Sequence, residues 1–560
     1  MAKERDEHPY IPKLKQQLVE GRLGRRAFLR SATLLGLSAA AAYGFVGKVT
    51  GERFAAPAHA AMPKGGSLRI GMRVKEVATP HTFDWAEKSN VCRQVCEYLT
   101  KTGHDNVTRP YLLEGWEASD DLKTWTLNLR KDIKWHNGRA FTAEDVIWNF
   151  NHVLEPATGS SVLGLMKAYL LEEYDTGKKD KDGNAVMSTR LWDANAIEQV
   201  GDHTIRLNAK SAQLAVPEHL FHYPFAMLDP EEGGKFGVGS NGTGPFELAE
   251  HEIGVQSVLK ARGDYWGEGP HLDTLRFIDL GDDASAYIGA LASKQVDGLF
   301  AADVSQIDVL KTLPHVQIFE AATAETAVAR VKVDQKPFDD ARVRKAMKLA
   351  VDQKQVLDFA LRGLGLMAEH HHVCEIHPEY AKLDFMGRDV EGAKALLEEA
   401  GYGGGLDLEI VCPNEPAWQP AAVQGMVEQW KDAGIRVKIN IMPGAQFWDV
   451  WDKVPFGYTI WYHRPLGVMV LGLGYRSGVP WNESGFANAD FDRLLAKAEG
   501  TLDVDERRAL MAEIEAIMQE DGPIVQPVWR SVFTFYDKRV QGFAQHPTNY
   551  IFGEELAIEG

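Results

Sequence analysis

Apolar and polar residues follow two different periods along the chain. Some short segments alternate with a period of two, which predicts β-strands, whereas others place apolar residues three and four positions apart, which predicts helices. The strands predicted in this way are 67–72 (an opening strand), 125–129 and, more briefly, 204–207. Because strand-like and helix-like segments alternate, the pattern predicts an α/β architecture.

Three helices are predicted from their first residues. Thr142 begins a Thr-Ala-Glu-Asp capping box, followed by apolar residues at helical spacing. Asp503 precedes a second apolar stripe, which ends at Gly522-Pro523, and Asp389 precedes a third, which stops at Gly401. We expect these stripes to be core and assign them no chemistry.

Length and charge narrow the classes of protein. The chain has 560 residues, of which 45% are hydrophobic and 25% charged, values typical of a soluble globular protein with two or more lobes. These values exclude a polytopic membrane protein and a mainly disordered one. Residues 1–60 hold 10 basic and 5 acidic side chains, which leaves 51 basic against 74 acidic in the remainder. So negative a surface repels phosphate backbones, and we expect no nucleic-acid partner.

The first sixty residues have the features of an export signal. Arg25 and Arg26 precede a mildly apolar stretch, 32–46, which is too short to span a bilayer comfortably. Ala58-His59-Ala60 offers a small-x-small cleavage pattern, with Ala61 as the mature start. The order of these features resembles a twin-arginine signal, and the alternative is a basic amphipathic helix retained in the cytoplasm. We expect a soluble periplasmic protein that uses the twin-arginine translocase during export.

Several short motifs occur in a fixed order between about residues 65 and 540. The clearest are Trp116-Glu117-Ala118-Ser119-Asp120, Trp135-His136-Asn137-Gly138, Gly242-Thr243-Gly244-Pro245-Phe246, Asp264-Tyr265-Trp266-Gly267, Pro337-Phe338-Asp339-Asp340 and Trp430-Lys431-Asp432-Ala433-Gly434. Together they resemble the family 5 extracytoplasmic solute-binding proteins, the periplasmic receptors of peptide-type and nickel-type ABC importers. The resemblance covers essentially the whole mature chain.

This resemblance implies the large, type II-like form of the periplasmic-binding-protein fold, with two α/β lobes joined by two hinge strands. Lobe one is expected over 61–320 with 528–560 returning to it, and lobe two over 321–527, after the export signal at 1–60. The lobes would close on a small organic solute, and the permease subunits of an ABC importer, with their cytoplasmic ATPases, would recognise the closed form. Neither catalytic residues nor a cofactor are implied. An exported hydrolase is a third possibility, but the sequence has no Gly-x-Ser-x-Gly elbow and no His-Glu-x-x-His motif.

One segment bears on the identity of the solute. Peptide-binding members of the family hold the free α-amino group with an Asp, but the matching segment here, 456–470, has no carboxylate and places Val468 at that position. The same segment carries His463 and Arg464, and an Arg suits bidentate binding of a carboxylate or phosphate. The sequence therefore favours a peptide-like or anionic conjugate. The alternative is that Arg464 pairs with a nearby acid.

Four further residues are candidates for ligand binding. Trp461 can stack on a flat or apolar part of a solute, and Trp418 lies in a loop between a strand and a helix, where α/β proteins often place binding groups. Asn90 and Tyr223 fall where related proteins line the cleft. For each of them the alternative is an ordinary packing role.

The tract from Glu369 to His377 concentrates imidazoles and a thiol, which can bind zinc, nickel or copper. A metal or metal-chelate carrier is therefore the alternative function, with His371 and His372 as weak candidate ligands. Adjacent histidines cannot all point at one ion from regular structure, so a loop without metal is favoured. Cys92 and Cys96 are four residues apart, a spacing that is awkward for a disulfide, and we expect them to be reduced.

Overall fold

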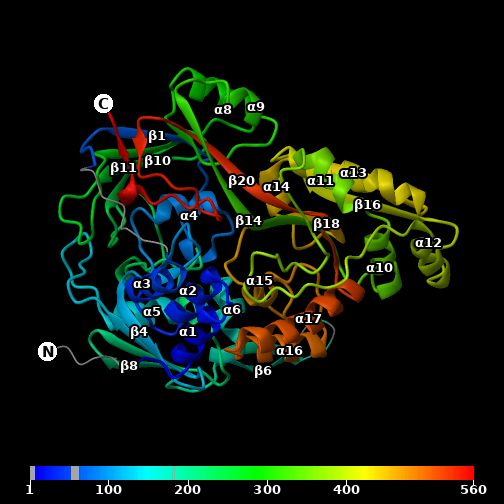
Figure 1. The fold of residues 1–560 in the computed structure, drawn as a ribbon, viewed down its shortest axis with the longest axis horizontal. Coiled ribbons are helices and arrows are strands. Elements are labelled where there is room, and N and C mark those ends of the chain that lie inside the picture. Colours follow the sequence, from blue (N-terminus) through cyan, green and yellow to red (C-terminus); the bar gives the residue numbers. More distant parts are fainter. Residues whose placement is uncertain (1–6, 52–61, 180, 182, 184) are drawn as a thin grey trace.

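The computed structural model describes residues 7–51, 62–179, 181, 183 and 185–560, and one sheet of twelve strands runs through much of it (Figure 1). Ten of these strands form a continuous path, and β15 (Gly365–Met367) and β19 (Ile524–Val525) pair beside it. The strands along the path are β10 (Phe246–Glu252), β11 (Gln256–Ala261), β12 (Thr274–Ile278), β1 (Ser67–Gly71), β13 (Gly298–Leu299), β20 (Val528–Asp537), β14 (Val316–Val331), β18 (Phe456–Trp461), β16 (Leu406–Pro413) and β17 (Ile435–Met442).

The two long strands β14 and β20 join the two ends of this sheet. They pair antiparallel from Val316 opposite Asp537 to Thr326 opposite Trp529, so they run side by side over most of their length. On one side of them lie the strands of lobe one, and on the other side β18, β16 and β17 of lobe two. The two strands lie where the resemblance places the hinge, and the exact lobe boundaries stay a prediction.

The helices and strands predicted from sequence are confirmed. Thr142 closes a capping box at the start of α5, and both Asp389 and Asp503 accept hydrogen bonds from the first turns of their helices. The confirmed elements are α5 (Ala143–Leu154), α12 (Val390–Glu399), α17 (Val504–Glu520), β1, β5 (Thr124–Leu129) and β9 (Thr204–Asn208).

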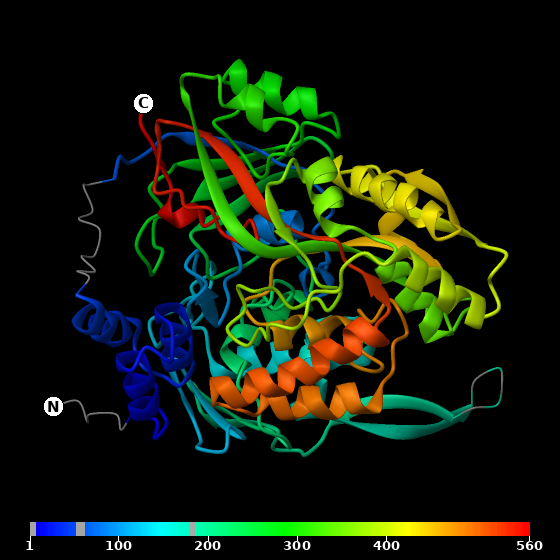
Figure 2. The same cartoon turned by 45° about the vertical axis from the view of Figure 1, so that its right-hand side comes forward.

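Other helices cover the sheet and the space between its ends (Figures 1 and 2). They are α4 (Ala86–Cys92), α6 (Val162–Leu170), α7 (Val216–His219), α8 (Ala284–Ala292), α9 (Ile307–Leu310), α10 (Ala341–Leu349), α11 (Gln353–Leu361), α13 (Trp418–Asp432), α14 (Gly444–Trp448), α15 (Gly467–Gly474) and α16 (Ala489–Glu499). The smaller sheets consist of β2 (Thr100–Thr102) with β3 (Thr108–Pro110), β4 (Leu113–Ala118) with β5, β9 and β8 (Ile197–Gly201), β6 (Leu171–Lys179) with β7 (Ala185–Leu191), and β21 (Val540–Gln541) with β22 (Ala557–Ile558).

The N-terminal segment, defined here as residues 7–51, forms three helices that pack on the rest of the molecule. They are α1 (Ile11–Val19), α2 (Arg25–Leu34) and α3 (Ala39–Thr50). Their buried apolar residues, among them Leu14, Phe28 and Val46, belong to the same hydrophobic cluster as Trp125. The cleavage pattern Ala58-His59-Ala60 and the expected start Ala61 lie outside the described residues.

Two further observations concern the described residues alone. None of their helices is long and apolar enough to cross a membrane. Cys92 and Cys96 are both buried and free, as predicted.

Candidate functional site

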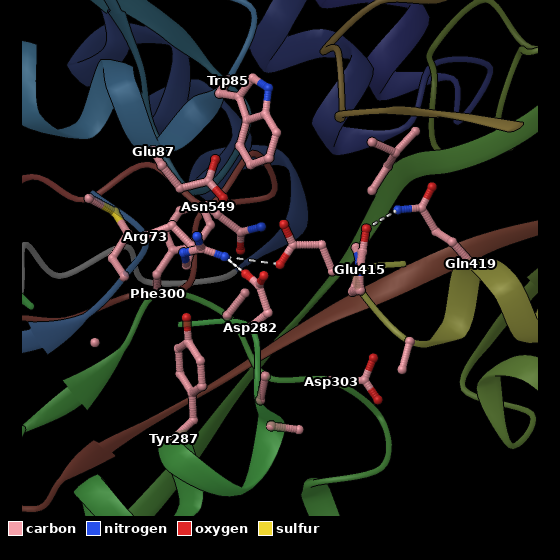
Figure 3. Close-up of a pocket in the computed structure, with 18 of the residues that line it drawn as sticks. Arg73, Trp85, Glu87, Asp282, Tyr287, Phe300, Asp303, Glu415, Gln419 and Asn549 are labelled. Atoms are coloured by element: carbon pink, nitrogen blue, oxygen red, sulfur yellow. Dashed lines mark hydrogen bonds and ion pairs between the residues drawn. The ribbon is translucent and has the colours of Figure 1, made fainter. Parts of the chain in front are cut away.

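A cavity of about 220 Å³ lies between the two ends of the sheet, beside the crossing strands. Its walls come from both predicted lobes (Figure 3). The charged, polar and aromatic residues that line it include Arg73, Trp85, Glu87, Asp282, Tyr287, Phe300, Asp303, Glu325, Glu415, Gln419, Trp448, Tyr462, Arg530 and Asn549.

The acidic residues of the wall reach the cavity from separate elements. Glu87 lies in the first turn of α4, where a negative side chain is favoured by the helix dipole. Glu415 lies in the loop between β16 and α13, and Asp303 in the loop between β13 and α9. Glu325 lies in β14 just after a register shift, at which Ala322 pairs with Ser531 and Glu325 with Arg530. A bulge of this kind changes the direction of a side chain. Of these four acids, Glu325 is the one that lies in a strand, and the bulge directly precedes it.

Both guanidinium groups of the wall already have carboxylate partners. Arg530 Nη1 lies 3.0 Å from Glu325 Oε1 in a pair that is nearly inaccessible to solvent. Arg73 Nη1 lies 3.2 Å from Glu415 Oε2 and also pairs with Asp282, and its Nε lies 3.1 Å from an oxygen of Asp279 behind the wall. Neither group therefore offers an unpaired positive charge to a solute.

Two carboxylate oxygens of the wall, by contrast, lack a partner among the described residues. Glu325 Oε2 and Asp303 Oδ2 are buried and accept no hydrogen bond from any described residue. Glu87 Oε2 accepts a long hydrogen bond of 3.5 Å from the Tyr462 hydroxyl. Burial raises the pKa of both Glu87 and Glu325, against the opposing effects of Lys75 on the first and Arg530 on the second. Buried acceptors without donors are costly, so this wall is suited to a solute that brings donors.

Aromatic rings form much of the remaining wall. Trp85 and Trp448 meet edge to face with their centroids 5.6 Å apart, and Lys75 Nζ lies 3.5 Å from the centroid of Trp85. Tyr287, Phe300 and Tyr462 also line the cavity. The walls thus carry five carboxylates and two guanidinium groups among apolar rings, a setting that favours an organic solute with a positive group.

Three of the residues predicted from sequence meet at a second, smaller cavity of about 30 Å³ beyond Tyr462. Tyr223, Trp461 and Arg464 all line it. The Arg464 guanidinium lies 5.4 Å from the Tyr223 ring, its Nη1 donates to the carbonyls of Tyr462 and His463, and its Nε has no partner. Within the part of the chain that the structure describes, no carboxylate pairs with Arg464, so its charge faces this small space.

The other three predicted residues line neither cavity. Both ring nitrogens of His463 are engaged, one with the Ala324 N–H at 3.0 Å and the other with Asn106 Oδ1 at 3.1 Å. Asn90 holds the backbone of the connection between β21 and β22 by donating to the Asn549 carbonyl and accepting from the Ile551 N–H. Their roles in binding stay predictions, and the geometry shows them supporting the wall.

Trp418 is the third of these residues. It is buried beneath Arg530, whose guanidinium carbon lies 5.5 Å from the ring, and its indole nitrogen has no partner. The next residue, Gln419, lines the main cavity instead. Trp418 was expected in the loop after β16, but it is the first residue of α13 and points away from the cavity that the loop residues line. A local pattern does not show which of two neighbouring side chains faces inward.

The imidazoles of the histidine-rich tract face separate partners. His372 Nδ1 lies 2.6 Å from the Tyr475 hydroxyl, and His371 Nε2 lies 3.5 Å from Glu369 and 3.7 Å from Glu515. Among the described residues no group of three His, Cys, Asp or Glu side chains is placed to hold a metal ion. The tract is therefore a buried loop within the described structure, and its geometry does not favour His371 and His372 as metal ligands.

Two lobes with a cavity between them are typical of a solute-binding protein. Residues 108–476 match the model of the bacterial extracellular solute-binding proteins, family 5 Middle, and the chain belongs to this family. Members deliver a solute to the permease of an ABC importer. The chain is 26% identical over 501 residues to heme-binding protein A of Haemophilus influenzae, which covers 85% of this chain and 88% of that protein.

Solved structures share the fold at lower identity. The periplasmic binding protein DppA from Helicobacter pylori in complex with peptide STSA has a TM-score of 0.76 and 18% identity, covering 89% of this chain and 99% of that one. NikA from Staphylococcus aureus in complex with Ni(L-His)2 has a TM-score of 0.73 and 17% identity, covering 88% and 100%. These likenesses confirm the two-lobed α/β fold. The ligands named for these relatives are heme, a peptide and a nickel complex. Because they differ in kind, the solute of this chain has to be inferred from its own site.

Proposed function

We propose that this protein captures a small peptide-like solute with a free amino group and delivers it to an ABC importer in the periplasm. The observation that carries the proposal is the set of buried, unpaired carboxylate oxygens on a wall built by both lobes. These carboxylates take the role that the missing Asp at position 468 has in peptide-binding relatives. The proposed anchor is therefore a positively charged amino group of the solute, whereas the sequence favoured an anionic group.

The small cavity is suited to a negative group on the same solute, because Arg464 lines it. Arg464 lies beyond Tyr462, and Tyr462 lines both cavities. A solute with its ammonium group near Glu325 and its carboxylate towards Arg464 would satisfy the unpaired groups at both ends. A peptide has this arrangement.

Closure follows from the same charges. Glu87 comes from predicted lobe one, whereas Glu325 lies on the lobe-two side of the predicted boundary. The charge of Glu325 contributes to raising the pKa of Glu87. An ammonium group between them attracts both, so it favours the closed form over the open one and shifts the population. A micromolar solute has about 8 kcal/mol for binding and closure together.

Export through the twin-arginine translocase is part of the proposal. Arg25 and Arg26 are both exposed at the start of α2, where another protein can reach them. Release of the mature chain after Ala60 would leave the receptor soluble outside the cytoplasm. A precursor that stays in the cytoplasm when both arginines are changed to lysine would support this route.

Binding of matched peptides tests the solute. We expect dipeptides to bind at micromolar concentration in calorimetry, and their N-acetyl forms to bind at least tenfold more weakly because the ammonium charge is gone. Glu325→Gln should weaken dipeptide binding by a similar factor, whereas Glu513→Gln, an exposed acid on α17, should not. Arg464→Ala should weaken binding of the dipeptide but not of its C-terminal amide.

Two results would contradict this proposal. If N-acetyl dipeptides bound as tightly as free ones, the amino group would not be the anchor. If binding needed a metal ion and was lost in chelator, the carrier of a metal chelate would be the better description.

A further inference from the structure

The N-terminal segment contacts both predicted lobes. On the side of lobe one, Arg30 Nε donates to the Asn106 carbonyl at 2.9 Å, and Trp116 Nε1 donates to the Leu34 carbonyl at 2.8 Å. Tyr43 also donates a hydrogen bond to Asp105. These contacts fasten α2 and α3 to the loop and strands β2–β4.

On the side of lobe two, the start of α1 meets Asp503, the N-cap residue of α17. The Tyr10 hydroxyl donates to Asp503 at 3.1 Å, and Lys13 Nζ lies 2.8 Å from the same carboxylate. Figures 1 and 2 both show α1 beside the orange helices α16 and α17. The segment thus spans the line along which the lobes meet.

Helix α17 is firmly part of lobe two at its other end. Lys348 of α10 is buried and donates to the carbonyls of Met518 and Gln519 at 2.7 and 2.9 Å. Arg344 of the same helix pairs with Asp521. A movement of lobe two would therefore carry α17, and with it Asp503, away from Asn106.

Side chains of the segment reach the line between the lobes at one place. A small space there is lined by Arg30 and Leu34 of the segment, by Glu218 of lobe one, and by Pro378 and Leu466 of lobe two. Burial lowers the pKa of Arg30 to about 10, against the opposing charges of Glu379 and Glu218, one from each lobe. The basic segment thus lies on acidic residues of both lobes, and Phe28 beside Arg30 is fully buried.

We propose that the N-terminal segment is an intramolecular latch, which holds the two lobes closed until it is removed. The proposal rests on the hinge closure of the proposed function. Opening would separate Asp503 from Lys13 and would move Glu379 of lobe two away from the Arg30 guanidinium that it attracts. The uncleaved precursor would therefore exchange solute slowly, and cleavage would free the hinge. Arg25 and Arg26 stay exposed while the latch is closed.

The test measures the distance between the lobes in the full chain. Spin labels go on Glu252→Cys in lobe one and Glu428→Cys in lobe two, both exposed positions, while the four native cysteines are buried. The protein is freed of solute by unfolding, dialysis and refolding. We expect a single short distance for the parent chain, and an added longer distance for Phe28→Asp, which removes the apolar anchor of the latch.

Phe359→Asp is the matched control, because Phe359 lies on α11 with 61% of its surface exposed and away from the segment. It should give the parent distance. If Phe28→Asp fails to fold, Lys13→Glu replaces it, with the exposed Lys48→Glu as control. Lys13→Glu places a negative charge against Asp503 and should also populate the longer distance.

The outcomes separate the latch from the proposed function. A single short distance in the folded Phe28→Asp chain would overturn the latch, as would a long distance already present in the solute-free parent. If Phe28→Asp opens and a binding dipeptide closes it again, both proposals are supported. If it opens and no dipeptide in the panel closes it, the latch stands and the proposed function is contradicted.

Discussion

Glu97 is a buried carboxyl in lobe one whose protonation should be visible in stability. It accepts hydrogen bonds from the Tyr265 hydroxyl at 2.7 Å and from Trp266 Nε1 at 2.9 Å, and burial raises its pKa to about 7. Between the pKa of an unfolded Glu and about 7, the folded chain holds a proton that the unfolded chain has lost. Stability due to this group is therefore full below about pH 4.5 and falls as pH rises to about 7.

Glu97→Gln should remove this pH dependence. We expect the parent to lose more unfolding free energy than the variant between pH 4.5 and 7, by an amount on the order of 2–3 kcal/mol, measured in urea at each pH. Glu218 and Glu515 are also buried with raised pKa values and contribute equally to both proteins. Glu114→Gln, at an exposed acid, should follow the parent. Equal slopes for parent and Glu97→Gln would contradict the assignment.

Only some of the individual residues that line the cavities could be predicted from the sequence. Arg464, Trp461 and Tyr223 were predicted as ligand-binding residues and line the small cavity, because the resemblance made the segments around β18 and after α7 recognisable. Glu87 and Glu325 were missed, since a single acid in a helix or a strand has no sequence pattern that separates it from a surface residue. Their meeting depends on the contact between lobes, which no local pattern encodes.

Among the elements, strand β14 controls where Glu325 points. The Thr323 hydroxyl donates to the Arg530 carbonyl at 2.7 Å and accepts the Glu325 N–H at 2.9 Å, so it stabilises the irregular stretch between Ala322 and Glu325. Thr323→Val keeps the shape and removes both bonds in a buried place. We expect a loss of about 1–3 kcal/mol of unfolding free energy and weaker dipeptide binding.

Thr323→Ser is the matched variant, because it keeps the hydroxyl. It should retain most of the stability in urea unfolding and most of the dipeptide affinity in calorimetry. If Val and Ser at this position behaved alike, the hydroxyl would have no part in placing Glu325.

Elements were easier to predict than this irregularity. The caps Thr142, Asp389 and Asp503 start helices within one residue of expectation, since a side-chain acceptor at the first turn acts locally. The register shift in β14 depends on its partner β20, which is about 200 residues away in sequence. Pairing between strands so far apart in the sequence produces no local periodicity from which the register shift could be predicted.

For the whole molecule, the resemblance predicted two lobes and crossing strands, and the solved structures confirm this fold. The packing of the N-terminal segment on both lobes was not expected from its sequence. Its basic and apolar residues fit an export signal and a docked helix equally well, and the choice depends on the acidic surface that it meets.

The overall charge of the molecule should also affect how fast a solute arrives. The chain carries −18, and five of its carboxylates against two of its guanidinium groups line the cavity wall. A negative cleft attracts cations over roughly the Debye length, which is about 10 Å at 0.1 M salt and about 3 Å at 1 M. The association rate of a dipeptide amide, which has a net charge of +1, should therefore fall several-fold between 0.05 and 1 M NaCl.

Stopped-flow fluorescence can follow this rate, because Trp85 and Trp448 lie in the wall. The dissociation rate should change much less, since the contacts that hold the bound solute are buried and poorly screened. A zwitterionic dipeptide has no net charge and should show a weaker dependence of association on salt. If the amide associated at the same rate at every salt concentration, the negative field of the cleft would not extend to the approaching solute. Selection for a cation would then depend on the buried contacts alone.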